Sequence, residues 1–193
     1  MFYGDGLLCP PDGYGEGIVE LLVMRRPDAA VKSFHPGEES LTLEAALRGA
    51  PSLIGKAPDL AYIALGAADA LRGTDPDEAL SSLRALLQVL RLKTTAHLAV
   101  ANVCTAFLPS EARPAAAVFN AGLAALAAGG EDATRLTLVD LDGPVTAFLE
   151  AHRRGPGEKR SLHAQPLRLT SMGRLLLARA AFERLGLEER LAL

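Results

Sequence analysis

The stretch MFYGDGLLCP, residues 1–10, carries the most specific indication of the fold in this chain. Its first four residues form a short apolar run, and Gly4-Asp5-Gly6 follows at once. Glycine adopts backbone conformations that other residues avoid, and the carboxylate of an aspartate can accept nearby backbone N–H groups. The stretch therefore predicts a short buried strand, Met1–Gly4, that ends in a turn fixed by Asp5.

Strand-like and helix-like segments alternate along the rest of the chain. Further apolar runs of strand length are Ala29–Phe34, Leu60–Gly66, His97–Val103 and Leu136–Leu141. Segments with helical spacing are Gly17–Arg25, Leu41–Ile54, Pro76–Leu92, Ala115–Ala128, Val145–Arg153 and Thr170–Leu185. Most of the strand-like runs lack polar alternation, which favours strands covered on both faces. The sequence thus predicts an α/β protein with three α/β/α layers and a flavodoxin-like, doubly wound parallel sheet of about five strands.

The segment Pro76–Leu92 has the clearest helix signals. Asp75 is a natural N-cap, Pro76 suits the first helical position, and two acidic residues follow in the first turn. Leucines recur on one face at positions 80, 83, 87 and 90. By contrast, Gly155–Gln165 is polar and rich in Gly and basic residues, which predicts a mobile surface loop before the last helix.

Length and charge limit the classes of protein to which the chain can belong. At 193 residues, 49% of them hydrophobic, a single domain over residues 1–193 is expected. A net charge of −3 gives no basic field, so nucleic acid is not expected as a partner. No apolar run approaches the roughly twenty residues that span a bilayer, and no signal-peptide pattern opens the chain. These features predict a cytoplasmic protein with no membrane partner.

Metal and cofactor signals are weak. Cys9 and Cys104 form no CxxC pair, so free thiols are favoured over a zinc site or a disulfide. No GxxxxGK[ST] or GxGxxG motif follows a strand, which disfavours nucleotide binding. We therefore expect no cofactor and no metal. Asp5, Asp69 and His163 are the residues that could ligate a metal, but they come from three separate loops and form no local spacing motif.

Three sequence blocks resemble those of the SGNH (GDSL-type) hydrolase family. FYGDGLLCPPDGYGEGIVELL (2–22) resembles the block in which Gly-Asp-Ser follows the first strand, and PDLAYIALGAADAL (58–71) resembles the Gly-x-Asn-Asp block. QPLRLTSMGRLLLA (165–178) resembles the last block, in which Asp-x-x-His precedes a Gly by five residues. The order and spacing of the blocks cover almost the whole chain. The resemblance implies the SGNH-hydrolase fold, with ligands bound at the carboxyl ends of the strands.

The catalytic positions that the resemblance implies carry unsuitable residues. The family uses a serine nucleophile, a histidine base, an aspartate that orients the base, and donors for an oxyanion. These positions are occupied here, in that order, by Gly6, Arg168, Gln165 and, for the side-chain donor, Ala68. Asp5 and Asp69 are retained. In the second block, VKSFHPGEES (31–40), Gly37 is retained and Phe34 stands where a glycine would supply an oxyanion donor. Acyl transfer by this route is therefore not expected.

Other residues offer alternative chemistry. A water or Cys9, assisted by His163 and Asp69, could serve an esterase with rearranged catalytic residues, and a pair of Cys9 with His35 is a further arrangement. A thiolate nucleophile needs a lowered pKa and a nearby base. Cys9 precedes two prolines and therefore has no helix N-terminus to lower its pKa, so a buried inert thiol is favoured.

Arg168 suggests binding in place of catalysis. Together with a free N–H of Gly6, its guanidinium could hold a carboxylate or phosphate. An ion pair between Arg168 and a surface glutamate is the simpler alternative. The residues expected to line a cleft for a small anionic ligand are Asp5, Gly6, Phe34, Ala68, Asp69 and Arg168. The sequence therefore predicts an inactive SGNH-like protein that binds a small ligand or a protein partner; a purely structural role in a homodimer or larger assembly stays open.

Overall fold

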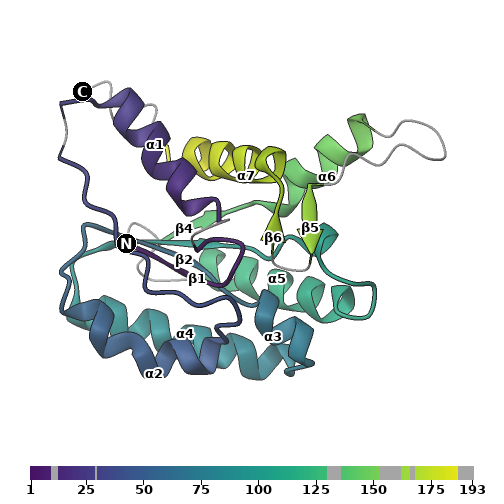
Figure 1. Ribbon diagram of the computed structural model, residues 1–193. Coiled ribbons are helices and arrows are strands. Elements are labelled where there is room, and N and C mark those ends of the chain that lie inside the picture. Colours follow the sequence, from purple (N-terminus) through teal and green to yellow (C-terminus); the bar gives the residue numbers. More distant parts are fainter. Residues whose placement is uncertain (10–12, 29, 130–135, 153–161, 166–167, 187–193) are drawn as a thin grey trace.

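The chain forms a parallel sheet between two layers of helices (Figure 1). The computed structural model describes residues 1–9, 13–28, 30–129, 136–152, 162–165 and 168–186, with the backbone only for 163–165. The strands are β1 (Phe2–Gly4), β2 (Leu60–Ala64), β3 (His97–Ala101), β4 (Leu136–Val139), β5 (His163–Gln165) and β6 (Arg168–Leu169). The helices are α1 (Gly15–Arg25), α2 (Leu43–Ile54), α3 (Ala67–Arg72), α4 (Pro76–Lys93), α5 (Arg113–Ala128), α6 (Asp142–Ala151) and α7 (Ser171–Arg184), with a 3₁₀ turn, η1, at Thr105–Phe107.

The main sheet has the order β1-β2-β3-β4, and every neighbouring pair is parallel. Helices α1, α6 and α7 cover one face, and α2, α3, α4 and α5 cover the other (Figure 1). This is the three-layer α/β/α architecture that the alternation of strands and helices predicts. All four strands run in one direction, so their carboxyl ends meet at one edge, where the loops after β1 and β2 lie side by side.

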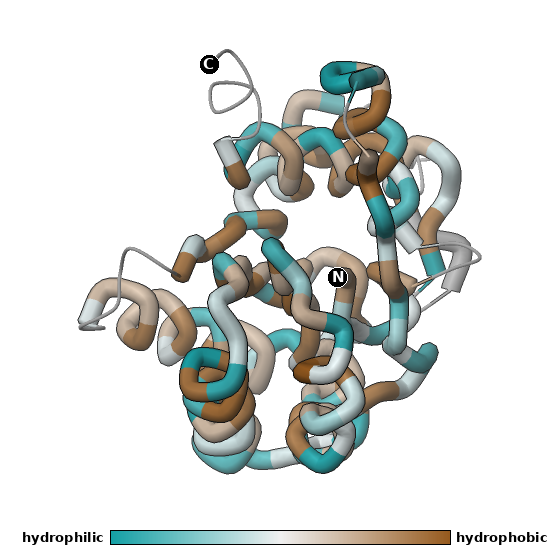
Figure 2. The backbone as a smooth tube through the Cα atoms, turned by 90° about the vertical axis from the view of Figure 1, so that its left-hand side faces the viewer, coloured by the Kyte–Doolittle hydropathy of each residue, from teal (hydrophilic) through white to brown (hydrophobic). Residues whose placement is uncertain are grey.

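Amphipathic helices close the core from both sides. The helix over residues 76–92 is confirmed as α4: Asp75 caps it by accepting the N–H groups of Asp77 (2.9 Å) and Glu78 (3.4 Å). Leucines 80, 83, 87 and 90 are all buried against the core. In Figure 2, hydrophobic and hydrophilic segments alternate along the helices, as expected for helices with one face on a sheet. The hydroxyl of Tyr3 in β1 donates to the carbonyl oxygen of Ala46 in α2 (2.9 Å), which joins the sheet to this layer.

The prediction of a strand at Ala29–Phe34 is wrong, so the described sheet has four strands instead of about five. Residues 30–34 form no strand, and the chain comes beside β1 only from Phe34 onward. Phe2 donates its N–H to the carbonyl oxygen of Phe34 (2.8 Å), and Gly6 donates to that of Glu39 (3.1 Å). Residues 30–34 are exposed, so they gain little from burial, and Pro36 has no N–H to contribute to a ladder.

A second, two-stranded sheet positions Arg168. Strands β5 and β6 are antiparallel, with Gln165 opposite Arg168 and His163 opposite Leu169. The sequence predicts a loop at Gly155–Gln165; the end of that segment is strand β5, and residues 155–161 lie outside the described part of the chain. The hairpin leads directly into α7, whose N-cap Thr170 accepts the N–H of Gly173 (3.3 Å).

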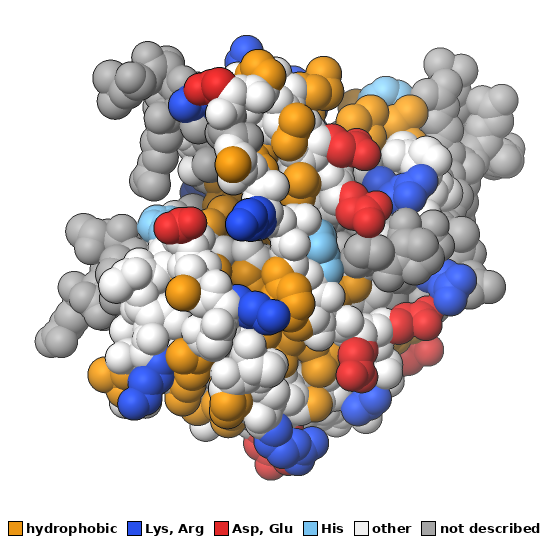
Figure 3. Space-filling view, turned by 60° about the vertical axis from the view of Figure 1, so that its left-hand side comes forward, with side chains coloured by type: hydrophobic (Ala, Val, Ile, Leu, Met, Phe, Trp, Pro, Cys, Tyr) orange, Lys and Arg blue, Asp and Glu red, His pale blue; other side chains and the backbone are white. Residues whose placement is uncertain are grey.

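The described residues include no membrane-spanning helix, and those visible in Figure 3 form no continuous charged field. Within the described residues, no helix combines the length and hydrophobicity needed to cross a bilayer. Lys and Arg side chains lie among Asp and Glu side chains and hydrophobic ones in Figure 3. The described residues on this face therefore do not give the uniform positive potential on which binding to a phosphate backbone depends.

Candidate functional site at the carboxyl edge of the sheet

The turn after β1 is built around Asp5, as the sequence predicts. Its buried carboxylate accepts the N–H of Leu7 (3.1 Å), and its carbonyl oxygen accepts those of Leu8 (3.1 Å) and Cys9 (3.0 Å). The pKa of Asp5 is raised to about 7, mainly by burial. The nearby negative charge of Asp69 raises it further. Asp5 thus holds the turn in place and lies below the surface.

Gly6 occupies the position at which the resemblance places a nucleophile, but its N–H is not free. It donates to the carbonyl oxygen of Glu39, with an N–O distance of 3.1 Å. The expectation that this N–H is free to bind a ligand is therefore wrong, because Glu39 already accepts it. The segment after β1 and the turn at residues 38–41 are close enough for one backbone group to satisfy the other.

The third block places Ala68 and Asp69 inside the fold. Gly66 precedes them with a φ of 112°, a conformation that favours glycine, and Ala68 is buried in α3 without a polar side-chain atom. The carboxylate of Asp69 accepts the N–H of Leu43, the first residue of α2, at 3.1 and 3.3 Å. Burial raises the pKa of Asp69. Asp69 therefore holds the first residue of α2, and its negative charge contributes to the raised pKa of Asp5.

Arg168 is paired with a surface glutamate, which is the simpler of the two arrangements considered from the sequence. Its Nε lies 3.0 Å from Oε1 of Glu39, and the side chains are 51% and 62% exposed, respectively. Gly6 and Arg168 thus both contact one residue, Glu39. Sequence analysis did not single out Glu39. The side chains of His163 and Gln165 lie outside the described residues, so their roles stay predictions.

Phe34 lies at the amino-terminal end of β1, away from Gly6 and Arg168 at the carboxyl edge of the sheet. Its carbonyl oxygen accepts the N–H of Phe2 at the start of β1, and Nζ of Lys56, beyond the end of α2, lies 4.7 Å from its ring centroid. The segment runs parallel to β1, so Phe34 meets the first residue of that strand and Glu39 meets Gly6 past its end. The expectation that Phe34 lines the same cleft is therefore wrong.

Cys9 and His35 each make contacts with other residues. The thiol of Cys9 donates to the carbonyl oxygen of Gly4 (3.2 Å), and burial raises its pKa to about 11. The ring of His35 stacks on Phe2 with centroids 5.0 Å apart, its Nδ1 has no hydrogen-bond partner, and burial lowers its pKa. A thiol with a raised pKa is a poor nucleophile at neutral pH.

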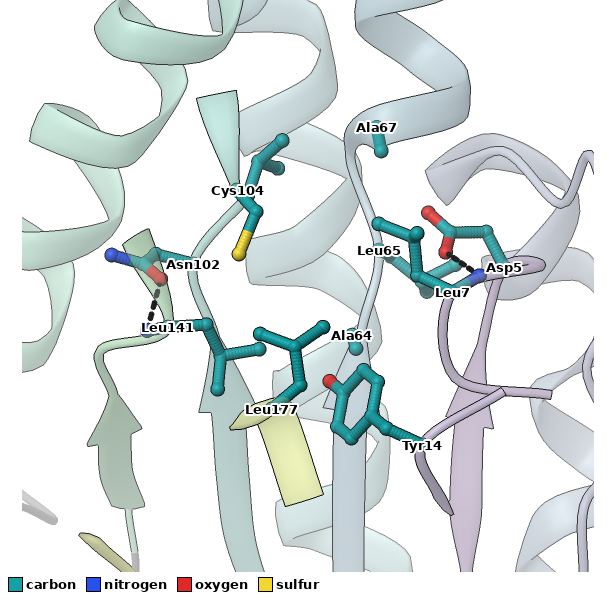
Figure 4. A pocket seen from close by; sticks show the side chains of 11 residues that line it. Asp5, Leu7, Tyr14, Ala64, Leu65, Ala67, Asn102, Cys104, Leu141 and Leu177 are labelled. Carbon is teal, nitrogen blue, oxygen red and sulfur yellow. Dashed lines mark hydrogen bonds between the residues drawn. The ribbon is translucent and has the colours of Figure 1, made fainter. Parts of the chain in front are cut away.

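A small cavity of about 20 Å³ lies beneath this edge (Figure 4). Asp5, Tyr14, Asn102 and Cys104 line it together with apolar side chains, so it has room for about one water molecule. The hydroxyls of Tyr14 and Tyr62 are hydrogen-bonded at 3.1 Å in the adjoining core. Burial raises the pKa of the Cys104 thiol, as it does that of Cys9, and both thiols are free.

Asn102 is a second residue that sequence analysis missed. It follows β3 directly, and its Oδ1 accepts the N–H of Leu141 (2.7 Å) while its Nδ2 donates to Asp140 (2.8 Å). A polar residue directly after an apolar strand is the signal that could have found it. In the described ranges no three His, Cys, Asp or Glu side chains gather as a metal site would require.

Comparisons with known proteins point to one fold. No protein-family model and no curated protein sequence matches the chain. Among solved structures, it is similar to an acetyl xylan esterase variant from Geobacillus stearothermophilus, with a TM-score of 0.77, 18% identity, and coverage of 96% of this chain and 93% of that chain.

Two further structures agree with this result. A member of the lipolytic protein G-D-S-L family from Veillonella parvula has a TM-score of 0.72 at 16% identity, with 94% of each chain covered. A family 3 carbohydrate esterase from Clostridium thermocellum has a TM-score of 0.72 at 17% identity, over 100% of this chain and 97% of that one. The chain therefore has the fold of the SGNH (GDSL-type) hydrolases.

Proposed function

We propose that the protein does not hydrolyse esters and instead binds a small anionic ligand at the edge formed by Gly6 and Arg168. The observation that carries this proposal is the occupancy of that edge by Glu39. Its carbonyl oxygen takes the N–H that would stabilise an oxyanion, and its carboxylate takes the guanidinium that stands at the position of the base. Both donors suit carboxylates, and neither can act as a nucleophile or a general base.

The first prediction is that the purified protein does not hydrolyse short acyl esters above background. Gly6 has no nucleophilic atom, Ala68 offers no side-chain donor, and the thiol of Cys9, with a pKa of about 11, is ionised to about one part in ten thousand at pH 7. Turnover of p-nitrophenyl acetate and labelling by a fluorophosphonate probe are the measurements. Burst kinetics or covalent labelling would show that a rearranged active site, with His163 as the base, is functional.

The second prediction is that Gly6→Ser alone does not create an esterase. A serine hydroxyl needs a base to remove its proton, and Arg168 cannot accept one at neutral pH. Gly6→Ala is the matched control because it adds a side chain at the same point without a hydroxyl. Hydrolysis by the serine variant above that of the alanine variant would mean that a base already lies within reach of position 6.

A protein partner is the second candidate. Large apolar side chains are exposed on the two helices of one layer, with Met24 of α1 78% exposed and Leu175 of α7 60% exposed. Isolated exposed apolar residues are common, so the test is direct measurement of assembly. Light scattering coupled to size-exclusion chromatography distinguishes a monomer from a homodimer, and a dimer that Leu175→Glu dissociates would support this candidate.

A further inference from the structure

Glu39 contacts both donors of the proposed site with two different groups. Its backbone carbonyl oxygen accepts from the N–H of Gly6 at 3.1 Å, and its carboxylate accepts from Nε of Arg168 at 3.0 Å. The donors come from the turn after β1 and from β6, which are more than 150 residues apart in sequence, so one residue joins two remote segments. The two accepting oxygens belong to the ends of a five-carbon skeleton, from the carbonyl carbon through Cα, Cβ and Cγ to Cδ.

We infer that Glu39 is a built-in occupant of this site, and that the ligand which displaces it has the same skeleton: two carbonyl groups joined by three carbons, with a carboxylate at Arg168. This inference rests on the proposed ligand-binding function. The simplest molecule of this class is glutarate. Succinate and adipate differ from this skeleton by one carbon each, and a single phosphate has no second group to match it.

The contacts of Glu39 allow it to be displaced. Both partners of the ion pair are more than half exposed, and such pairs are weak because water and salt screen them. The ligand supplies an equivalent carboxylate to the Nε of Arg168 in place of that of Glu39.

The backbone contact can be released locally. Leu41 donates to the carbonyl oxygen of Glu38 at 3.2 Å and closes a turn in which Glu39 and Ser40 are the central residues. Turns of types I and II differ by a flip of the peptide between their central residues, and the flip leaves the closing hydrogen bond intact. Ser40 does not have the positive φ that the flipped form requires, so the present orientation, with the carbonyl on Gly6, is favoured. Ser40→Gly removes that preference.

The test is a titration of ¹⁵N-labelled protein with sodium glutarate at pH 8 and constant ionic strength. The N–H signal of Gly6 and the Nε–H signal of Arg168 report on the two donors separately. The proteins are the wild type, Glu39→Ala, Ser40→Gly and Arg168→Ala, with Glu38→Ala as the matched control because Glu38 is the adjacent exposed carboxylate. Succinate and adipate serve as probes of shorter and longer chain length.

We expect Glu39→Ala to bind glutarate about three- to fivefold more tightly than the wild type, the gain expected from removing a competing exposed ion pair. Ser40→Gly shifts the affinity in the same direction, Glu38→Ala does not, and glutarate binds more tightly than succinate or adipate. Arg168→Ala removes the binding.

Two results overturn the inference in distinguishable ways. If glutarate binds through Arg168 but Glu39→Ala and Glu38→Ala match the wild type, Glu39 is not a competing occupant and the proposed ligand site stands. If no protein, including Glu39→Ala, shows a shift of the Gly6 signal that depends on Arg168, the proposed ligand site itself fails.

Discussion

Asp5→Asn is expected to make the protein more stable than the wild type at pH 8, with the difference shrinking toward pH 4. The pKa of Asp5 rises from its ordinary value of 3.8 to about 7 on folding, mainly through burial. A carboxyl with a raised pKa in the folded state contributes most below its unfolded pKa, and this contribution is lost as the pH rises through the folded value. Asn keeps the acceptor that Leu7 uses and cannot ionise.

The expected size of this effect is large. At about 1.4 kcal/mol per pKa unit, the stability difference between the variant and the wild type changes by on the order of 4 kcal/mol between pH 4 and pH 8. Urea unfolding of both proteins at several pH values measures it, and the subtraction cancels groups that titrate in both. Glu111→Gln, which replaces an exposed carboxyl by an amide, is the matched control for the chemical change itself. A constant difference for Asp5→Asn would contradict a buried, protonated Asp5.

Gly37→Ala is expected to destabilise the protein by about 3 kcal/mol, or to detach residues 34–39 from β1. A Cβ atom at Gly37 would lie 2.0 Å from the carbonyl oxygen of Gly4 and 2.3 Å from Sγ of Cys9. The first of these neighbours is backbone, so the segment must move away to admit a methyl group. The segment carries Glu39, so its displacement also breaks the contact between Glu39 and Gly6.

Thermal unfolding separates this effect from the general cost of replacing a glycine. For a domain of this length, 3 kcal/mol corresponds to a fall in Tm of roughly 6–12 °C. Gly55→Ala is the matched control, since its nearest atom would be 4.0 Å away and its φ of −62° suits alanine. Equal Tm values for the two variants would mean that the close packing of Gly37 on β1 does not hold in solution.

Local patterns were sufficient to predict most of the sheet and the helices around it. Strands β1 to β3 are largely buried apolar runs, β4 is a partly buried one, and α4 has its own cap, so each could be identified from neighbouring residues alone. The expected strand at Ala29–Phe34 has a similar apolar content, but whether it joins the sheet depends on burial that no local pattern records. Helix α3 is too short to show a period, and the β5–β6 hairpin is defined by its pairing.

The site was predictable only in part for the same reason. The positions of Asp5, Gly6, Ala68 and Asp69 follow from strands whose ends are evident in the sequence. The contact between Arg168 and Glu39 joins residues 129 positions apart, and only the folded chain brings them together. Glu39 is one of two adjacent acidic residues in an exposed turn, so nothing in its sequence context distinguishes it from Glu38.

The positions of the buried tyrosines determine which part of the protein its near-ultraviolet absorbance and intrinsic emission report on. The chain has three tyrosines and no tryptophan, and Tyr3, Tyr14 and Tyr62 are at most 3% exposed. All three lie around β1 and β2, and two share the hydroxyl pair in the core. Near-ultraviolet absorbance and intrinsic emission therefore report on the first half of the sheet and on the part of α7 beside Tyr14, and not directly on the β5–β6 hairpin. An unfolding curve followed by tyrosine emission needs far-ultraviolet circular dichroism beside it before it can be taken as the unfolding of the whole domain.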